Sequence, residues 1–93
     1  MLLLFDIGNT NTHVGLANDR RVMRQTDIPT AALLGGKAKT RLRRFVGQAR
    51  VDGVALCSVV PQATPRVRKA VRELWKRNCL ELTPKTLHGV GID

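Results

Sequence analysis

Aromatic and acidic residues are scarce in this chain of 93 residues. It contains two Phe, one Trp and no Tyr, and its seven Asp and Glu are outnumbered by sixteen Lys and Arg, which gives a formal net charge of +9. With so few aromatic side chains, the core must be aliphatic. The positive charge is typical of proteins that bind nucleic acid, membrane surfaces or anionic substrates, and by itself it does not choose among these partners.

Cysteines and long apolar runs are also few. Cys57 and Cys79 lack the spacing of metal ligands, so the sequence excludes a zinc module and a disulfide scaffold, and we expect a reducing, cytoplasmic location. The opening apolar run from Met1 to Phe5 ends at Asp6 and is too short for a signal peptide or a membrane span. We therefore expect one domain over residues 1–93, with no membrane partner.

Three strands are predicted in the first 29 residues. Residues 2–7 form a nearly continuous apolar run, which is typical of a strand buried on both faces. Residues 12–17 alternate like a second strand, and residues 21–28 indicate a third, more exposed strand that Pro29 closes. Because Gly and Asn residues mark short turns between them, we expect an antiparallel meander.

After Gly35-Gly36 the spacing of apolar residues changes from that of strands to that of helices. We interpret these two glycines as a flexible lead into a helix. Apolar residues between Ala38 and Ala49 have helical spacing, and a buried strand that includes Cys57 follows and ends at Pro61. A second helix is predicted from Thr64 as N-cap, with Pro65 at its first position, to Asn78, and residues 80–82 form a last strand. The order β-β-β-α-β-α-β predicts an α/β fold, a ribonuclease-H-like mixed sheet covered by helices.

The segment Asp-Ile-Gly-Asn-Thr-Asn-Thr, residues 6–12, is the sharpest local feature. An aspartate at the end of a buried strand can hold Mg²⁺ directly or through water. Gly8 lets a phosphate approach the backbone, and the amides and hydroxyls of the turn can donate to its oxygens. The alternative is a hairpin that needs Gly and Asn for its geometry. Asp6 favours the functional interpretation, because an acidic group that ends a buried strand needs a partner.

Two segments resemble signatures of one family. Residues 1–18, with Asp6-Ile7-Gly8-Asn9-Thr10, resemble the first phosphate motif of type III pantothenate kinases, which belong to the superfamily of acetate and sugar kinases, heat-shock ATPases and actin. Residues 54–61, Val-Ala-Leu-Cys-Ser-Val-Val-Pro, resemble that family's next signature, a buried strand ahead of a helix. The resemblance covers the whole chain in element order and is weakest over residues 30–50.

The resemblance implies an enzyme that phosphorylates pantothenate with ATP, the first step toward coenzyme A. It also implies Mg²⁺, a monovalent cation (K⁺ or NH₄⁺) and a homodimer. Asp6 would be the catalytic and metal-binding residue, beside the transferred phosphate. The ATP phosphates would be lined by Asp6 and the residues that follow it, namely Gly8, Asn9, Thr10, Asn11, Thr12 and His13. From its pattern alone, however, His13 is a packing or polar-face residue rather than a general base.

The chain departs from the family in length. It stops at Asp93, about a third of the family's length, and lacks the Gly-x-Asp-Arg segment with the family's base, the second phosphate motif and the adenosine loop. Gly91-Ile92-Asp93 resembles part of the first of these, but no Arg follows it. We therefore expect an N-terminal piece, an incomplete half of an actin-like ATPase fold, that is inactive alone.

A nuclease or nucleic-acid-binding protein on the same scaffold is the main alternative. It would share the first-strand aspartate, the meander and the basic surface. Metal-dependent nucleases of this layout need a second carboxylate near the end of the fourth strand, whereas this strand ends at Cys57-Ser58. Binders of single strands use stacking aromatics, which are too few here. A folding module without activity of its own is the third possibility. The sequence favours the kinase, with no specific nucleic-acid partner.

Overall fold

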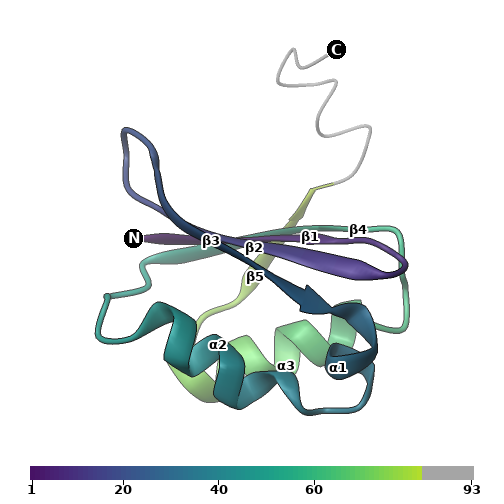
Figure 1. Ribbon diagram of the computed structural model, residues 1–93. Coiled ribbons are helices and arrows are strands. Elements are labelled where there is room, and N and C mark those ends of the chain that lie inside the picture. Colours follow the sequence, from purple (N-terminus) through teal and green to yellow (C-terminus); the bar gives the residue numbers. More distant parts are fainter. Residues whose placement is uncertain (83–93) are drawn as a thin grey trace.

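A five-stranded mixed sheet with three helices against one of its faces makes up the computed structural model, which describes residues 1–82 (Figure 1). The Gly91-Ile92-Asp93 segment lies outside the described residues. The strands are β1 (Leu2–Ile7), β2 (Asn11–Ala17), β3 (Val22–Pro29), β4 (Gly53–Ser58) and β5 (Cys79–Leu82), and the helices are α1 (Thr30–Leu34), α2 (Ala38–Val46) and α3 (Thr64–Trp75).

The sheet has the order β3-β2-β1-β4-β5. The first three strands pair antiparallel, whereas β1 pairs parallel with β4 and β4 parallel with β5. Parallel neighbours need crossover connections, and α2 and α3 provide them. The predicted meander and the mixed sheet are confirmed, and one extra helix, α1, interrupts the predicted order. No helix among residues 1–82 has the length and apolar character that crossing a membrane would require.

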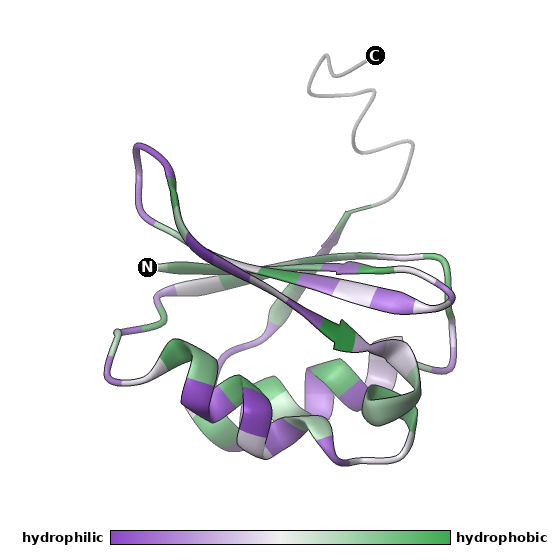
Figure 2. Ribbon diagram, in the orientation of Figure 1, coloured by the Kyte–Doolittle hydropathy of each residue, from purple (hydrophilic) through white to green (hydrophobic). Residues whose placement is uncertain are grey.

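The core lies between the sheet and the helices. Every second residue of β1 (Leu3, Phe5 and Ile7) is buried there, and Leu42 of α2 and Val67 of α3 meet them from the other side as members of one cluster. Apolar and polar residues alternate along α2 and α3 (Figure 2), and the apolar ones that are buried, such as Leu42 and Val67, belong to the core beneath the sheet. The core is aliphatic apart from Phe5, as the composition predicts.

The prediction that β1 is buried on both faces is wrong. Leu2 is 46% exposed and Asp6 is exposed, while the residues between them are buried or half-buried. The reason is that all three helices lie on one side of the sheet, and no described residue covers the other side (Figure 1). We call these the covered face and the open face. Asp6 belongs to the open face and remains in water, so burial does not force a partner on it.

Helix α1 was not predicted, and it changes the role of Gly35-Gly36. The five residues of α1 are too few to show a helical period. Gly35 is the C-cap of α1, and Gly36 follows with a φ of 74°. This backbone conformation suits glycine, which has no Cβ to clash. The two glycines therefore end one helix before α2 begins, rather than serving only as a flexible lead.

Both predicted ends of α3 need correction. The carbonyl of Ala63 accepts the first helical hydrogen bond, from the Val67 amide at 3.0 Å, so Ala63 and not Thr64 is the N-cap, and Pro65 comes one position later than expected. The helix ends at Trp75, ahead of the predicted Asn78. Lys76 turns the chain there with a φ of 58°, while its amide donates to the Arg72 carbonyl. Cys57, expected in the core, is only half-buried.

Candidate functional site

The loop between β1 and β2 is a tight hairpin turn at one end of the sheet. The Gly8 amide donates to the Asn11 carbonyl at 3.0 Å and closes it. A Cβ at position 8 would lie 3.0 Å from the same carbonyl oxygen, so the turn accepts only glycine without a shift. The three residues beyond it (Asn9, Thr10 and Asn11) are exposed. The turn therefore presents amides, a hydroxyl and two side-chain amides to solvent.

Thr30, the first residue of α1, fastens this turn from behind. Its hydroxyl donates to the Gly8 carbonyl at 2.6 Å, and its amide donates to the Thr10 carbonyl at 2.9 Å. The Oγ1 atoms of Thr30 and Thr12 lie 3.0 Å apart, and both side chains are buried. Because the Thr30 proton is used on Gly8, the Thr12 hydroxyl is the donor in this pair. The turn is thus held rigidly by a residue that is distant in sequence.

Asp6 lies on the open face in a row of polar residues. In the strand register it opposes His13 on β2 and Cys57 on β4, and His13 opposes Asp27 on β3. The His13 Nδ1 atom contacts Asp27 Oδ1, and both side chains are largely exposed. A hollow of about 210 Å³ on this face is lined by Asp6 and His13 together with apolar residues such as Leu4 and Val22. A ligand at the turn would reach this row directly.

The structure brings most of the predicted site residues together. Asp6, His13 and the loop that begins at Gly8 lie at the same end of the open face. Thr12 does not join them, because alternation along β2 turns it to the covered face, where it is 0% exposed. It can position the turn but does not offer its hydroxyl to a ligand.

Two residues of this region were missed by the sequence reasoning. Asp27 could have been paired with His13 from the hairpin register. The only sequence feature that could have placed Thr30 near the turn is its position directly after Pro29, which pairs with Asn11.

Two carboxylates stand in this row, Asp6 and Asp27, and Asp27 contacts His13. Within residues 1–82 no group of three or more His, Cys, Asp or Glu side chains could hold a metal ion. Mg²⁺ does not require such a group, because it is commonly bound by one or two carboxylates together with substrate phosphates and water. Asp6 fits that mode, being exposed and one residue from the turn. The end of β4 adds no acid, and the Ser58 hydroxyl is occupied locally by the Val60 backbone at 3.0 Å.

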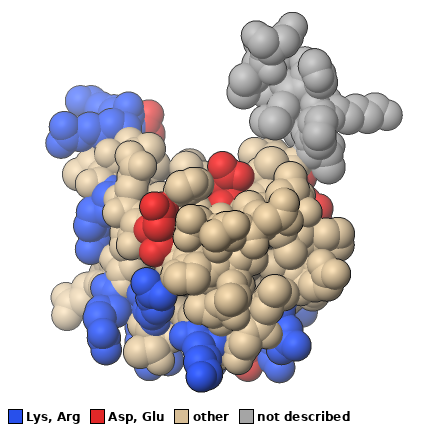
Figure 3. Space-filling view, turned by 45° about the vertical axis from the view of Figure 1, so that its right-hand side comes forward, with Lys and Arg blue, Asp and Glu red and all other residues tan. Residues whose placement is uncertain are grey.

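The charges of the molecule are distributed unevenly. In Figure 3 the basic side chains gather along the lower side, where the helices lie, and at the upper left, while acidic side chains are few. Among residues 1–82, Asp52 and Cys79 have a shifted pKa, and both lie away from the turn. A hydrogen bond from the N-terminal ammonium holds the pKa of Asp52 below its ordinary value, and burial raises the pKa of the Cys79 thiol. In the strand register Asp6 faces no Lys or Arg, because its partners are His13 and Cys57.

Two solved structures share the fold. A Porphyromonas gingivalis protein, described as a candidate N-acetylglucosamine kinase, matches 87% of this chain with a TM-score of 0.66 and 14% identity, over 34% of its own length. RuvC of Thermus thermophilus matches 86% of this chain with a TM-score of 0.58 and 17% identity, over 60% of its own length. At such low identities these likenesses show the fold alone, and they confirm the ribonuclease-H-like and actin-like layout.

Sequence comparisons are more specific. The family model described as type III pantothenate kinase matches residues 2–93. A type III pantothenate kinase of Frankia alni is 39% identical over 99% of this chain, and one of Nitratidesulfovibrio vulgaris is 38% identical over 81%. The chain spans 38% and 31% of the lengths of these two relatives. The match runs through the Asp6 strand, the turn and both crossover helices, and it shows that this chain belongs to the type III pantothenate kinase family.

Proposed function

We propose that this chain is the N-terminal, ATP-phosphate-binding part of an enzyme that transfers a phosphoryl group from ATP to pantothenate, toward coenzyme A. One observation carries the proposal: in this member of the family, the exposed Asp6 lies on the open face next to the rigid turn formed by residues 8–11. The names of the relatives support the substrates. Because the chain spans 38% of the Frankia relative, we expect residues 1–93 to be inactive alone.

The turn would bind the phosphates of ATP. Gly8 allows close approach of an oxygen to the backbone, and the exposed residues Asn9, Thr10 and Asn11 would donate to it from amides and side chains. His13 lies beside them on the open face and can donate from the ring nitrogen that does not face Asp27. Thr12 would contribute from the covered face, by holding Thr30 and through it the turn. Such positioning is what phosphoryl transfer mainly requires of a protein.

Asp6 would hold Mg²⁺ at the transferred phosphate, directly or through water. The ion, when bound, would neutralise charge on the phosphate oxygens. The carboxylate is suited to this because it is exposed and fixed on a central strand. We further propose, from family membership, a monovalent cation (K⁺ or NH₄⁺), a homodimer and a cytoplasmic location.

The kinase proposal can be tested in the full-length protein by measuring ADP release. We expect release to require both ATP and pantothenate. Gly8→Ala should raise the KM for ATP about tenfold or more, because the new Cβ would press on the Asn11 carbonyl and displace the turn. Gly15→Ala is the matched control on the same face, since its Cβ would meet Val22 Cγ1 at an ordinary 3.7 Å.

Two results would count against the proposal. ADP release that does not depend on pantothenate would remove the substrate assignment. An unchanged KM for ATP in the Gly8→Ala variant, with the Gly15→Ala variant also unchanged, would remove the turn from the nucleotide site.

A further inference from the structure

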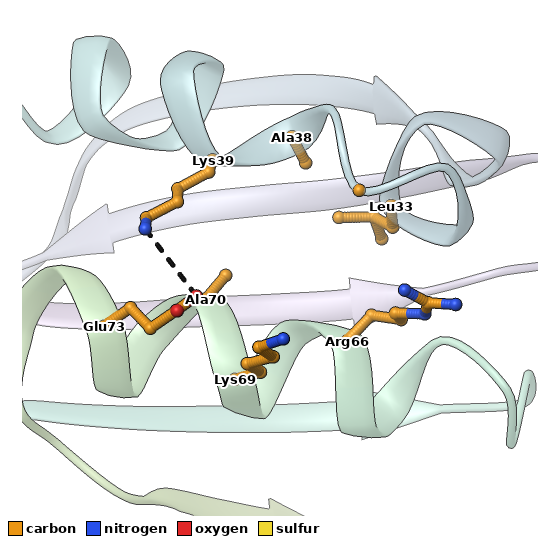
Figure 4. Close-up of a pocket in the computed structure, with 8 residues that line it drawn as sticks. Leu33, Ala38, Lys39, Arg66, Lys69, Ala70 and Glu73 are labelled. Carbon is orange, nitrogen blue, oxygen red and sulfur yellow. Dashed lines mark ion pairs between the residues drawn. The ribbon is translucent and has the colours of Figure 1, made fainter.

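A second cavity lies on the other side of the sheet, within the helix layer. It has a volume of about 130 Å³ and opens between α3 and the segment that connects α1 to α2 (Figure 4). Leu33, Ala38 and Ala70 form its apolar wall. One water molecule needs roughly 10–15 Å³ by the same measure, so the space is suited to a group of several atoms.

Three cationic side chains and one acidic side chain surround this cavity. Lys39 of α2 pairs with Glu73 of α3, with 3.6 Å between Nζ and Oε1. Arg66 and Lys69 come from α3 and line the same space (Figure 4). Within residues 1–82, neither of them makes an ion pair or a side-chain hydrogen bond. The cavity therefore carries two positive charges that no described carboxylate balances.

The spacing on α3 places these charges together. Arg66, Lys69, Ala70 and Glu73 follow one another at i, i+3, i+4 and i+7, which puts them on one side of the helix. This side is distinct from the stripe of Val67 and Val71, which is buried against the sheet. Helix α3 therefore has one polar side that lines the cavity and another side that packs in the core.

Two of the cations around the cavity lie at helix starts. Lys39 lies in the first turn of α2 and Arg66 in the first turn of α3, and neither first turn contains an acidic residue. Free amides at a helix start carry partial positive charge, so cations there are normally unfavourable. An anion in the cavity would relieve the repulsion among these groups and leave the Lys39–Glu73 pair in place.

We propose that this cavity binds the phosphate group of a small phosphorylated molecule, with Arg66 and Lys69 as its main ligands and the apolar wall against the adjoining carbon atoms. Both side chains are suited to phosphate, Arg through paired donors and Lys as a mobile point charge. The site is separate from the Gly8 turn, since it lies on the covered side of the sheet. It goes beyond the proposed kinase function and does not depend on it.

The test is a titration of the 93-residue chain with inorganic phosphate, followed through backbone amide chemical shifts in about 0.15 M NaCl, which screens loose association with exposed charges. We expect saturable shifts at residues 36–39 and 66–73, which include the cavity lining, whether or not the Gly8 turn also responds. Phenyl phosphate, which adds an apolar ring to the same anion, should bind more tightly. Gly8→Ala should leave the response of these cavity residues unchanged. The test of the cavity is therefore independent of the proposed role of the turn.

Matched variants separate a built site from general attraction to a basic surface. Lys69→Ala should weaken binding about three- to tenfold, as expected for one partly exposed charged hydrogen bond. Ala70→Leu should abolish saturable binding without changing the charge, because it fills the cavity. Arg43→Ala is the control, since it removes an equal charge from α2 outside the cavity and should have no effect. Equal weakening by Arg43→Ala and Lys69→Ala, or shifts that spread without saturation over all basic residues, would overturn the proposal.

Discussion

The two faces of the sheet are built from the same strands but have opposite roles. On β1, Leu3, Phe5 and Ile7 enter the aliphatic core under the helices, while Leu2 and Asp6 remain exposed on the other side. The covered face is apolar and tightly enclosed. The open face carries the polar row of Asp6, His13 and Asp27 beside the exposed turn.

Because of this difference, neighbouring residues of one strand should affect different properties, namely stability on the covered face and ligand binding on the open face. A substitution on the covered face removes packing and should lower the free energy of unfolding. A substitution on the open face changes groups that are already in water, so it should affect ligand binding and leave the fold intact. The Gly8 turn is the place where the two faces meet, because Thr12 and Thr30 fix it from the covered side.

The largest expected effect contrasts two leucines. Leu56 is 1% exposed and packs on the covered face, in register with Phe5, whereas Leu2 is 46% exposed. Leu56→Ala should lower the free energy of unfolding by about 2–5 kcal/mol, because it leaves a cavity in the core. Leu2→Ala should cost less than about 1 kcal/mol. Urea unfolding of both variants measures the contrast, and equal losses would show that the open face is as tightly packed as the covered one.

A smaller effect is expected at the junction of the faces. Thr30→Val removes the partner of the buried Thr12 hydroxyl and the hydrogen bond to the Gly8 carbonyl. An unsatisfied buried hydroxyl costs about 1–3 kcal/mol. Thr12→Val in the same chain should recover part of this loss, since no buried hydroxyl is then left without a partner. A double-mutant cycle by urea unfolding tests the coupling, and strictly additive losses would mean that the two hydroxyls do not interact.

The smallest effect concerns Asp52, at the end of the sheet where the N-terminus lies. The N-terminal ammonium donates to its Oδ2 at 2.7 Å and lowers the pKa of the carboxyl in the folded state. A carboxyl whose folded pKa is lowered stabilises the protein above its unfolded pKa, and this stabilisation disappears as the pH falls through the folded pKa.

Asp52→Asn should therefore reduce stability slightly at neutral pH, and not at a pH below the lowered folded pKa of Asp52, where neither protein carries the charge. Urea midpoints at the two pH values measure the effect. A larger loss in acid than at neutral pH would contradict the assigned pKa direction.

Much of the fold follows from local patterns in the sequence. Alternation predicted the meander, helical spacing predicted α2 and α3, and the Asp6–Thr12 segment marked the turn that we propose binds phosphate. These features could be predicted because each depends on residues that are close together in the chain. The hairpin register would also have placed Thr12 on the side of Ile7, its partner, and hence away from Asp6.

The remaining features depend on contacts between distant residues. Leu2 and Leu4 are apolar, and nothing in the local sequence indicates that all three helices pack on the covered face and leave these two residues on the open face. Thr30 reaches Gly8 across 22 residues, and α1 is too short to show a period. Ala63, rather than Thr64, is the N-cap because its carbonyl accepts the first hydrogen bond of α3. The position at which α3 begins depends on the path of the whole β4–α3 connection, and not only on the capping preference of one residue.

The division between the two faces is tested most directly by Asp6→Asn, with turnover and unfolding measured on the same full-length protein. Asp6 is exposed on the open face, so the free energy of unfolding should stay within about 0.5 kcal/mol of the original. Turnover of ATP with pantothenate should fall at least about 100-fold, because the charge that would hold the metal at the transferred phosphate is lost. Asp19→Asn, at the exposed β2–β3 turn, should change neither quantity. Turnover within a few-fold of the original in Asp6→Asn, or a loss of activity explained by unfolding, would contradict the account.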